Sequence, residues 1–328
     1  MITNYKQLEL STQIIIKEAL KRNIDVEILD EDDNFIRLKK GGRVEYIKQA
    51  TKTSADTYIV ALIMENKELT KLILKEHDIN VPSGITLNHI DEALSKYPDF
   101  ISKDIVIKPK STNFGEGVSI LKGLKSKEDY VRAVKEALSY DNHILIEEFI
   151  PGKEYRFLVI NDEVAAVMHR VPANIVGDGV HNIKELVYEK NKDPRRGKGH
   201  ITPLEKINIG PIEENNLASQ NKDISYVPSN GEIVYLRENS NISTGGDSID
   251  FTDDINDQYK EIAVDASKAV EAKICGVDMI IQDVKAKPDK NNHSIIELNF
   301  NPVLYPHNFP YKGQNRHVEE KVLDLLRF

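Results

Sequence analysis

Acidic and amide side chains gather near the C-terminal end of the chain in a pattern suited to a metal ion. Asp278 lies in one predicted strand, and Glu297, Asn299 and Asn301 lie in or just beyond the next. Side chains two residues apart in a strand project to the same face, and hairpin pairing would bring Asp278 against them. Carboxylate and amide oxygens are ligands that Mg2+ prefers. We therefore predict a metal site at Asp278, Glu297 and Asn299, with solvated polar positions as the alternative.

A lysine follows an apolar strand and precedes a loop that contains glycine. Lys108 comes directly after residues 105–107, and the loop over 111–117 carries Gly115 and Gly117. An ammonium group neutralises phosphate oxygens, and glycines let backbone N–H groups approach them closely. The loop does not match a Walker A motif, and two glycines alone are weak evidence. An ordinary hairpin turn with exposed lysines is the alternative.

The segment 144–154 reads as a buried strand that runs into a hinge between two domains. Backbone groups at 148–150 can pair with the edge of an adenine, and Phe149 and Ile150 can cover its faces. Glu154 can accept hydrogen bonds from ribose hydroxyls. A domain linker with no ligand is the alternative.

Three arginines, Arg156, Arg170 and Arg237, stand at the ends of predicted strands. Arg237 is followed by the segment 238–246, which is rich in small hydroxyl, amide and glycine residues. An arginine in such surroundings suits an oxyanion or a carboxylate, although a surface salt bridge explains each arginine taken alone.

Other common kinds of site have no support in the sequence. The nine histidines show no His-x-x-x-His or His-Cys spacing, so we do not expect zinc. Ser243 is not in a Gly-x-Ser-x-Gly elbow, which argues against a hydrolase. His169 and His307 are therefore interpreted as substrate-pocket or structural residues.

Hydrophobic periodicity and turn residues predict a mixture of helices and strands. Residues 25–47 read as a short βαβ-like unit with a hairpin at Gly41-Gly42, and 193–199 reads as a basic loop that is either a lid or merely solvated. We expect helices over 11–22, 66–77, 90–96, 127–140, 256–274 and 318–326, and strands over 25–29, 35–38, 44–47, 105–108, 118–121, 143–147, 155–160, 164–170, 276–282 and 294–299. This pattern divides the chain into an N-terminal lobe (1–82), a central α+β unit (83–152) and a C-terminal unit (153–328).

Composition sets limits on compartment and partners. The chain has 328 residues, 40% of them hydrophobic, which is typical of a globular protein with a substantial core. A net charge of −9 argues against a general nucleic-acid or membrane-surface binder. We see neither a signal peptide nor a membrane span, and the single Cys275 reads as a buried thiol in a reducing compartment. The expected location is the cytoplasm, and the oligomeric state stays open between a monomer and a homodimer.

Taken in order, the lysine-containing helix, the lysine strand with its glycine loop, the acidic hinge and the Asp278…Glu297-x-Asn299 pattern resemble the ATP-grasp superfamily. The closer resemblance is to the glutathione synthetase module of bacterial bifunctional glutamate-cysteine ligase and glutathione synthetase, and next to the ATP-grasp part of cyanophycin synthetase. Long stretches carry this resemblance, at 7–13, 34–53, 61–67, 169–180, 191–207, 237–252 and 299–326.

The resemblance implies an α+β ATP-grasp fold of three subdomains, with ATP held between two α+β lobes. It implies a carboxylate-amine ligase that uses ATP and Mg2+ or Mn2+ to join a small carboxylate donor to an amine acceptor through an acyl phosphate. Arg237 and Lys108 would take part in catalysis, and Asp278, Glu297 and Asn299 would hold the metal. The residues expected to hold ATP are Lys67, Lys108, Lys110, Ser111, Gly115, Gly117, Glu147, Glu148, Phe149, Ile150 and Glu154. The residues expected to hold substrate are Arg156, Arg170, Asn241, Ser243, Thr244, Gly245 and His307.

Two departures from the family pattern bear on these roles. D-alanine ligases have an arginine two residues before the metal aspartate, where this chain has Gly276. The bifunctional proteins carry a glutamate-cysteine ligase domain upstream, so the chain reads as a stand-alone relative or a fragment. Three functions therefore stay open: ligation of γ-glutamylcysteine to glycine, ligation of another amino acid or peptide, and nucleotide binding without ligation.

Overall fold

The computed structural model describes residues 5–111, 117–199 and 201–328, which form two compact units. Unit 1 combines Met1–Ala55, Val164–Asp253 and Asn301–Phe328, and unit 2 combines Asp56–Glu163 and Asp254–Phe300. The chain thus passes between the units several times. The three-part division of the sequence stays a prediction.

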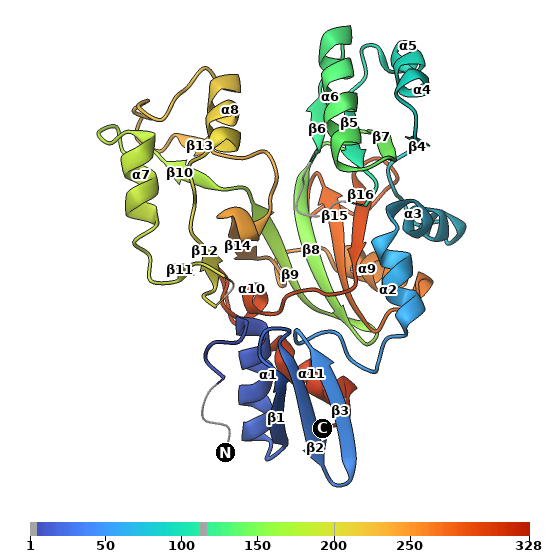
Figure 1. Ribbon diagram of the computed structural model, residues 1–328, viewed down its shortest axis with the longest axis vertical. Helices are drawn as coiled ribbons and strands as arrows, with labels where there is room; N and C mark the ends of the chain where they lie inside the picture. Colours follow the sequence, from blue (N-terminus) through green and yellow to red (C-terminus); the bar gives the residue numbers. More distant parts are fainter. Residues whose placement is uncertain (1–4, 112–116, 200) are drawn as a thin grey trace. The chain divides into compact units, whose positions relative to one another are not determined.

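One sheet of unit 2 contains the lysine strand and the hinge strand. Its order is β4 (Gly84–Leu87), β7 (Ile144–Glu148), β5 (Ile105–Pro109) and β6 (Ser119–Leu121), and all neighbours are antiparallel. Three helices pack with it: α4 (Ile90–Ser95), α5 (Tyr97–Phe100) and α6 (Lys127–Tyr140) (Figure 1). The apolar core between them centres on Tyr130, whose hydroxyl donates to the Ala93 carbonyl at 2.7 Å. The buried residues of β5 and β7 belong to this core, which holds both strands in position.

The metal candidates of unit 2 lie on a second set of strands. β15 (Ile274–Ile281) runs antiparallel between β8 (Lys153–Ile160) and β16 (His293–Asn299). The helix α9 (Asp257–Ala269) packs on β15 and β8, while α2 (Tyr58–Glu65) and α3 (Lys67–Glu76) contact β16. Almost every residue of β15 is buried, so Asp278 is a carboxylate placed in a hydrophobic strand.

The N-terminal part of unit 1 is an antiparallel sheet, so the predicted βαβ-like unit is wrong. Strands β1 (Asp25–Asp30), β2 (Phe35–Lys40) and β3 (Arg43–Lys48) follow one another directly, because the connections between them are too short for a helix. Gly41 and Gly42 have φ of +56° and +82°, which suits the predicted hairpin turn. The helices α1 (Leu10–Lys21) and α11 (Val318–Leu325) pack together, and α10 (Tyr305–Asn308) contacts α1 (Figure 1).

The rest of unit 1 is built from short elements. Its strand pairs are β9 (Glu163–Val171) with β14 (Asp247–Asp250), β10 (Asn174–Val176) with β13 (Ile233–Tyr235), and β11 (Arg196–Gly197) with β12 (Leu204–Glu205). Its helices are α7 (Ile183–Lys190), α8 (Pro211–Ser219) and the 3-10 turn η1 (Ile242–Thr244). Buried Arg196 excludes the interpretation of 193–199 as a merely solvated loop.

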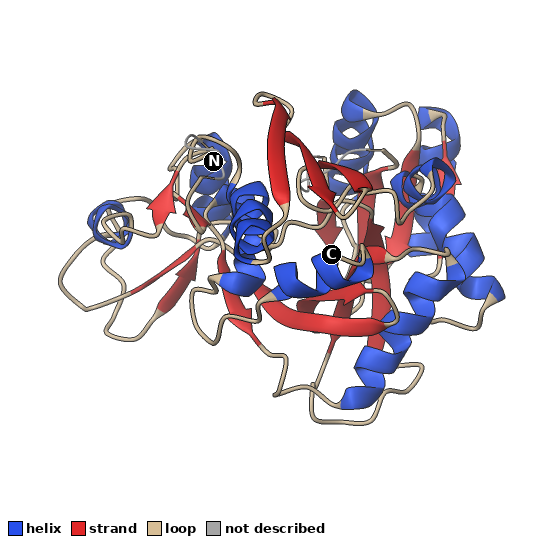
Figure 2. Ribbon diagram, turned by 90° about the horizontal axis from the view of Figure 1, so that it is seen from below, coloured by secondary structure: helices blue, strands red, loops and turns tan. Residues whose placement is uncertain are grey.

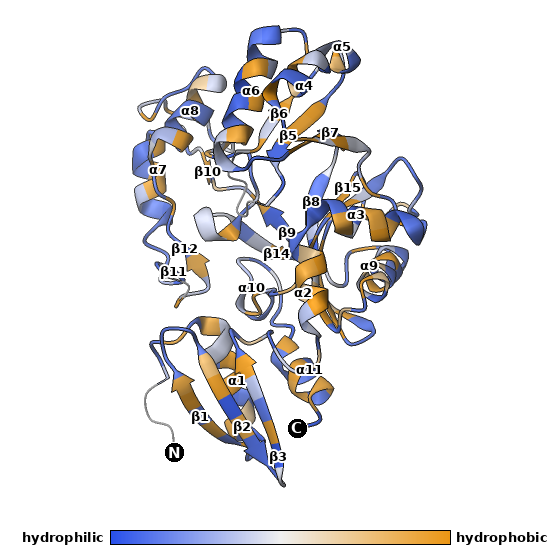
Figure 3. Cartoon of the chain, turned by 45° about the vertical axis from the view of Figure 1, so that its right-hand side comes forward, coloured by the Kyte–Doolittle hydropathy of each residue, from blue (hydrophilic) through white to orange (hydrophobic). Residues whose placement is uncertain are grey.

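Both units combine helices with strands (Figure 2), and their sheets are mainly antiparallel, which confirms the α+β class. The helix α2 is hydrophobic along most of its length (Figure 3), with Val60 and Met64 buried and Tyr58 and Ile59 exposed. Within the described part of the chain, no helix combines the length and the hydropathy that a membrane crossing requires. The cytoplasmic location stays a prediction.

Candidate active site

Strand pairing in unit 2 brings the three predicted metal ligands together. The β15–β16 register sets Asp278 opposite Glu297 and Gly276 opposite Asn299. Asn299 Nδ2 lies 3.4 Å from Asp278 Oδ2, at the long end for a hydrogen bond. Asn301, beyond the end of β16, belongs to unit 1.

Arg156 orients the Asp278 carboxylate. Arg156 is the cross-strand neighbour of Asp278 on β8, and its Nε and Nη2 donate to the two Asp278 oxygens, the second at 2.6 Å. Burial alone would lower the pKa of Arg156, but the Asp278 carboxylate outweighs it and raises that pKa, so Arg156 stays protonated. Arg156, expected to bind substrate, is therefore engaged with the predicted metal ligand.

The donor set fits a hard divalent cation. The Asp278 and Glu297 carboxylates face each other across β15 and β16, with the Asn299 side-chain amide beside Asp278. Asn299 donates through Nδ2, which leaves its Oδ1 as the ligand atom. Two carboxylates and an amide oxygen are the hard oxygen ligands that Mg2+ and Mn2+ take.

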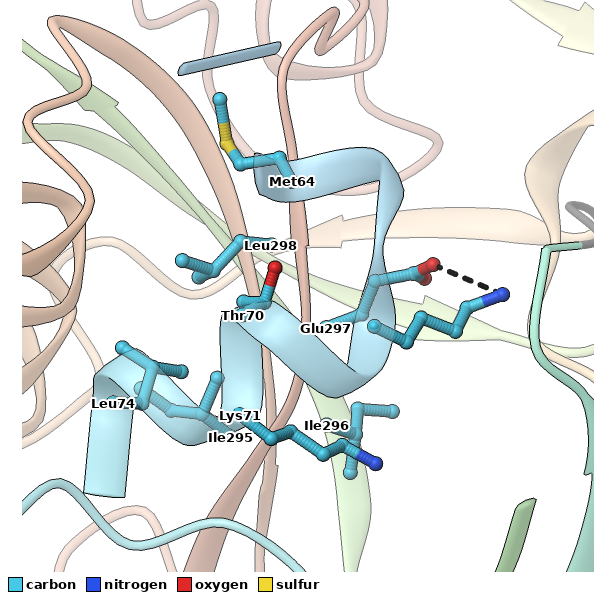
Figure 4. A pocket seen from close by; sticks show the side chains of 9 residues that line it. Met64, Thr70, Lys71, Leu74, Ile295, Ile296, Glu297 and Leu298 are labelled. Atoms are coloured by element: carbon cyan, nitrogen blue, oxygen red, sulfur yellow. Dashed lines mark ion pairs between the residues drawn. The ribbon is translucent and has the colours of Figure 1, made fainter. Parts of the chain in front are cut away.

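Lys67 lies beside this cluster at the start of α3. Asn66 caps the helix by accepting from the Leu69 N–H, and Lys67 is the first helical residue. Its Nζ lies 3.7 Å from Glu297 Oε1, the ion pair dashed in Figure 4. Burial lowers the pKa of Lys67, and the neighbouring Glu297 only partly opposes this. A cation thus stands next to the predicted metal carboxylates.

A small cavity opens between α3 and β16, lined by Met64, Lys67, Thr70, Lys71, Leu74 and residues 295–298 (Figure 4). Its volume of about 10 Å³ is room for about one water molecule. The cavity itself therefore cannot be the nucleotide pocket.

Lys108 and Glu147 lie on neighbouring strands and form an ion pair. Lys108 Nζ is 2.8 Å from Glu147 Oε2, and Lys71 of α3 contacts the other oxygen, Oε1. Burial lowers the pKa of Lys71 to about 8. For Lys108 the effect of burial is outweighed by Glu147, which raises the Lys108 pKa. The carboxylate predicted to hold adenosine is thus held by two lysines.

The described residues at the two ends of the glycine loop contact other residues of unit 2. Lys110 pairs with Glu68 at 2.7 Å, and the Ser111 N–H donates to Asp141 Oδ2 at 2.8 Å. Gly117 has φ of +69° and an added Cβ would meet Pro109 and Tyr140, so glycine is required there. Gly115 lies outside the described residues.

Two backbone N–H groups of the hinge segment 148–150 already donate hydrogen bonds within the protein. The N–H groups of Glu148 and Phe149 donate to the carbonyls of Ser83 and Asp104, at 3.0 Å and 2.9 Å. The Phe149 ring lies under the Lys122 ammonium, 5.0 Å from its centroid. Ile150 and Glu154 are partly exposed.

The predicted substrate residues lie in unit 1, apart from Arg156. Arg170 Nε donates to the Ser240 carbonyl at 3.2 Å, and Arg237 pairs with buried Glu213. Ser243 and Thr244 lie in η1, and Gly245 follows with φ of +94°. Asn241 caps this turn by accepting from the Ser243 N–H, and His307 is buried.

Sequence reasoning missed Lys71 and Arg196. Lys71 stands four residues after Lys67, a spacing that puts both on one face of a helix, and this signal was available. Arg196 ion-pairs with Asp247 and its Nη1 donates to the carbonyls of Glu205 and Gly245, at 2.7 Å and 3.1 Å. No local pattern points to that set of partners.

Three family models match successive parts of the chain. Residues 6–59 match an ATP-grasp-like domain, 65–174 the phosphoribosylglycinamide synthetase ATP-grasp (A) domain, and 220–313 the RimK-like ATP-grasp domain. The chain belongs to the ATP-grasp superfamily and has its α+β fold.

Within that superfamily the chain is similar to bifunctional glutathione proteins. It is 58% identical to the glutathione biosynthesis bifunctional protein of Clostridium perfringens, over 99% of this chain and 42% of that protein. It is 54% identical to the protein of the same name from Listeria monocytogenes, over 98% of this chain and 42% of that protein. The crystal structure of a bifunctional glutathione synthetase from Pasteurella multocida matches with 44% identity and a TM-score of 0.76, over 98% of this chain and 44% of that one. The chain thus spans less than half the length of these relatives.

Proposed function

We propose that the chain is an ATP-dependent carboxylate-amine ligase that joins γ-glutamylcysteine to glycine through an acyl phosphate. The carrying observation is the clustering in unit 2 of the carboxylates Asp278 and Glu297 with the ammonium group of Lys67. Such a set neutralises phosphate charge, as phosphoryl transfer requires. The names of the relatives supply the choice of glutathione synthesis.

In this proposal unit 2 holds the nucleotide. Lys67, Lys108 and Lys110 neutralise phosphate oxygens, with Ser111 and Gly117 beside them, while Gly115, also expected to bind ATP, lies outside the described residues. Adenine lies against Phe149 and Ile150. Because the N–H groups of Glu148 and Phe149 already donate to carbonyls, adenine recognition depends on the remaining hinge groups. Glu154 accepts from the ribose hydroxyls.

Asp278, Glu297 and Asn299 would hold Mg2+ or Mn2+, with Arg156 fixing the Asp278 carboxylate through its two hydrogen bonds. A divalent ion bound there supplies positive charge to phosphate oxygens. Lys67, 3.7 Å from Glu297, would add its positive charge beside that ion.

The reaction needs positioning more than a protein nucleophile. The donor carboxylate attacks the γ-phosphorus in line, the bond from that phosphorus to the bridging oxygen breaks, and ADP leaves. The acceptor amine then attacks the acyl carbon, phosphate leaves, and the amine loses a proton. We assign Arg237 to the acyl-phosphate oxygens, and Arg170, His307 and the turn 241–245 to the substrates.

The test incubates the purified chain with Mg-ATP, γ-glutamylcysteine and glycine, and follows phosphate release and product mass. Phosphate and glutathione formed in equal amounts, and lost in Glu297→Gln, are the expected result. Phosphate and a different product with other amino acids or short peptides would keep the ligase and change its substrate. ADP binding with no amine-dependent phosphate release from any of these substrates would contradict ligation.

A further inference from the structure

A buried carboxylate that bridges two lysines lies at the proposed phosphate site. We propose that Glu147 is a positioning residue, which fixes the Lys108 ammonium for a nucleoside phosphate, and that Lys71 holds Glu147 in place. In this role the Glu147 side chain makes no contact with adenosine. The inference rests on the proposed nucleotide site of unit 2 and deepens it.

The geometry of the three side chains carries this assignment. Glu147 Oε2 accepts from Lys108 at 2.8 Å, and Oε1 accepts from Lys71. Only 5% of the Glu147 side chain is exposed, against 15% for Lys108 and 10% for Lys71. Both Glu147 oxygens are thus engaged, and Lys108 has the most exposed side chain of the three. An ammonium has three donors, so the bond to Glu147 leaves Lys108 with donors for phosphate oxygens.

The backbone around Glu147 is shaped for its side chain. Gly84 on β4 is the cross-strand partner of Glu147. A Cβ built on Gly84 would lie 2.7 Å from Glu147 Cγ and 2.5 Å from the Ile146 carbonyl oxygen. Since real side chains do not approach this closely, glycine at 84 lets the Glu147 side chain keep its place over the strand.

The charges explain why the carboxylate is needed. Lys67, Lys71 and Lys108 bring three positive charges into a poorly solvated region, where the carboxylates of Glu147 and Glu297 act on them. Like charges disfavour each other and burial disfavours any ammonium. Of these two carboxylates, Glu297 is assigned to the metal in the proposed function. Glu147 is then the group that keeps Lys108 protonated.

The experiment separates phosphate recognition from adenosine recognition. A fluorescent ADP analogue is displaced by ADP or by adenosine from the full chain and from Glu147→Gln. We expect ADP affinity to fall about tenfold or more in the variant, because a charge-assisted hydrogen bond is weakened, and adenosine affinity to stay unchanged. Lys75→Met, an exposed position one turn further along α3, serves as the matched control and should change neither affinity.

Further variants keep the test decisive where Glu147→Gln does not fold. Lys71→Met keeps the Lys108–Glu147 pair and should weaken ADP binding by a smaller factor, with recovery in Lys71→Arg. Gly84→Ala keeps all charges and should weaken ADP binding by displacing Glu147.

Two outcomes overturn the inference, and a third is separate from it. An equal loss of adenosine and ADP affinity in Glu147→Gln or in Lys71→Met would place the carboxylate at adenosine, and unchanged ADP affinity in the folded variants would remove its role. Failure of the unsubstituted chain to bind the ADP analogue would instead contradict the proposed function on which the inference rests.

Discussion

Asp278 and Glu297 are both predicted metal ligands, yet their surroundings differ. The Asp278 side chain is almost wholly buried against Arg156, whereas that of Glu297 is 29% exposed and 3.7 Å from Lys67. We expect Asp278→Asn to lower the free energy of unfolding by about 3–5 kcal/mol, because it leaves a buried guanidinium without its partner charge. Glu297→Gln should lower it by less than about 1 kcal/mol.

Urea unfolding of the two variants, followed by circular dichroism, measures this difference. Both variants should lose metal-dependent turnover, so activity alone does not separate them. Equal midpoints would show that the Arg156–Asp278 pair contributes no more to stability than the Lys67–Glu297 pair.

His181 is an exposed histidine with a defined charge partner. Its Nδ1 lies 2.6 Å from Asp178 Oδ2, and this hydrogen bond raises the pKa of His181 and, with two backbone N–H groups, lowers that of Asp178. The raised pKa stabilises unit 1 below the unfolded value of about 6.5, and the effect is lost as pH rises through the folded value. The lowered pKa of Asp178 stabilises unit 1 above the unfolded value of about 3.9, and this stabilisation is lost as pH falls through the folded pKa of Asp178.

An NMR titration of the His181 ring checks this expectation. The ring should titrate above its ordinary value in the unsubstituted chain and return toward that value in Asp178→Asn. A titration that Asp178→Asn leaves in place would assign the shift to other groups.

At the residue scale, the sequence predicts pairs that local spacing defines. Asp278 and Glu297 face each other as the predicted hairpin requires. The partners of Arg156, Glu147 and Arg196 are different, because each is far away along the chain and is set by strand register or by tertiary packing. The triad of Lys71, Glu147 and Lys108 could be seen only in the folded structure.

At the element scale, the short strand pair β11–β12 depends on Arg196. Its guanidinium is fully buried, pairs with Asp247 of β14 and holds the Gly245 carbonyl at the end of η1. Lys190 pairs with the other Asp247 oxygen at 2.7 Å. Arg196 thus fixes the turn 241–246, where the proposed function places substrate.

We expect Arg196→Met to destabilise unit 1 by about 3 kcal/mol or more, because it removes a buried charge partner and two carbonyl hydrogen bonds. Lys198→Met, exposed and two residues away, is the control and should stay within about 0.5 kcal/mol. Chemical denaturation of both variants measures the difference. If Arg196→Met left the free energy of unfolding unchanged, apolar packing alone would hold β11 and β12.

Several helices with strong periodicity are predicted from the sequence, whereas α2, α7 and α8 are not. The expected helices over 66–77 and 127–140 match α3 and α6, which have Asn66 and Ser126 as N-caps. α8 was missed because its sequence has only two large apolar residues, Ile212 and Leu217. Leu217 is buried in a core made by residues from α7, β10 and β13, so α8 owes its place to tertiary packing.

At the scale of the whole molecule, the two compact units are interleaved in sequence. Strand β8 ends in one unit and β9 continues in the other, and residues 301–328 return to unit 1 after β16. The crossings fall at residues 55–56, 163–164, 253–254 and 300–301. A linear reading of the sequence therefore yields consecutive blocks and cannot show such returns.

The single cysteine of the chain reports on unit 2 alone. Cys275 is buried in β15, and burial raises the pKa of its thiol to about 12, so it should react with a thiol reagent only when unit 2 opens. A ligand that binds the folded form at one hundred times its Kd stabilises it by about 2.7 kcal/mol. We expect Mg-ADP to move the urea midpoint of Cys275 labelling upward, and expect Glu147→Gln to reduce this shift at the same ADP concentration. Bound ADP with no change in labelling would place the nucleotide outside unit 2, since a ligand protects the unit whose folded form it binds.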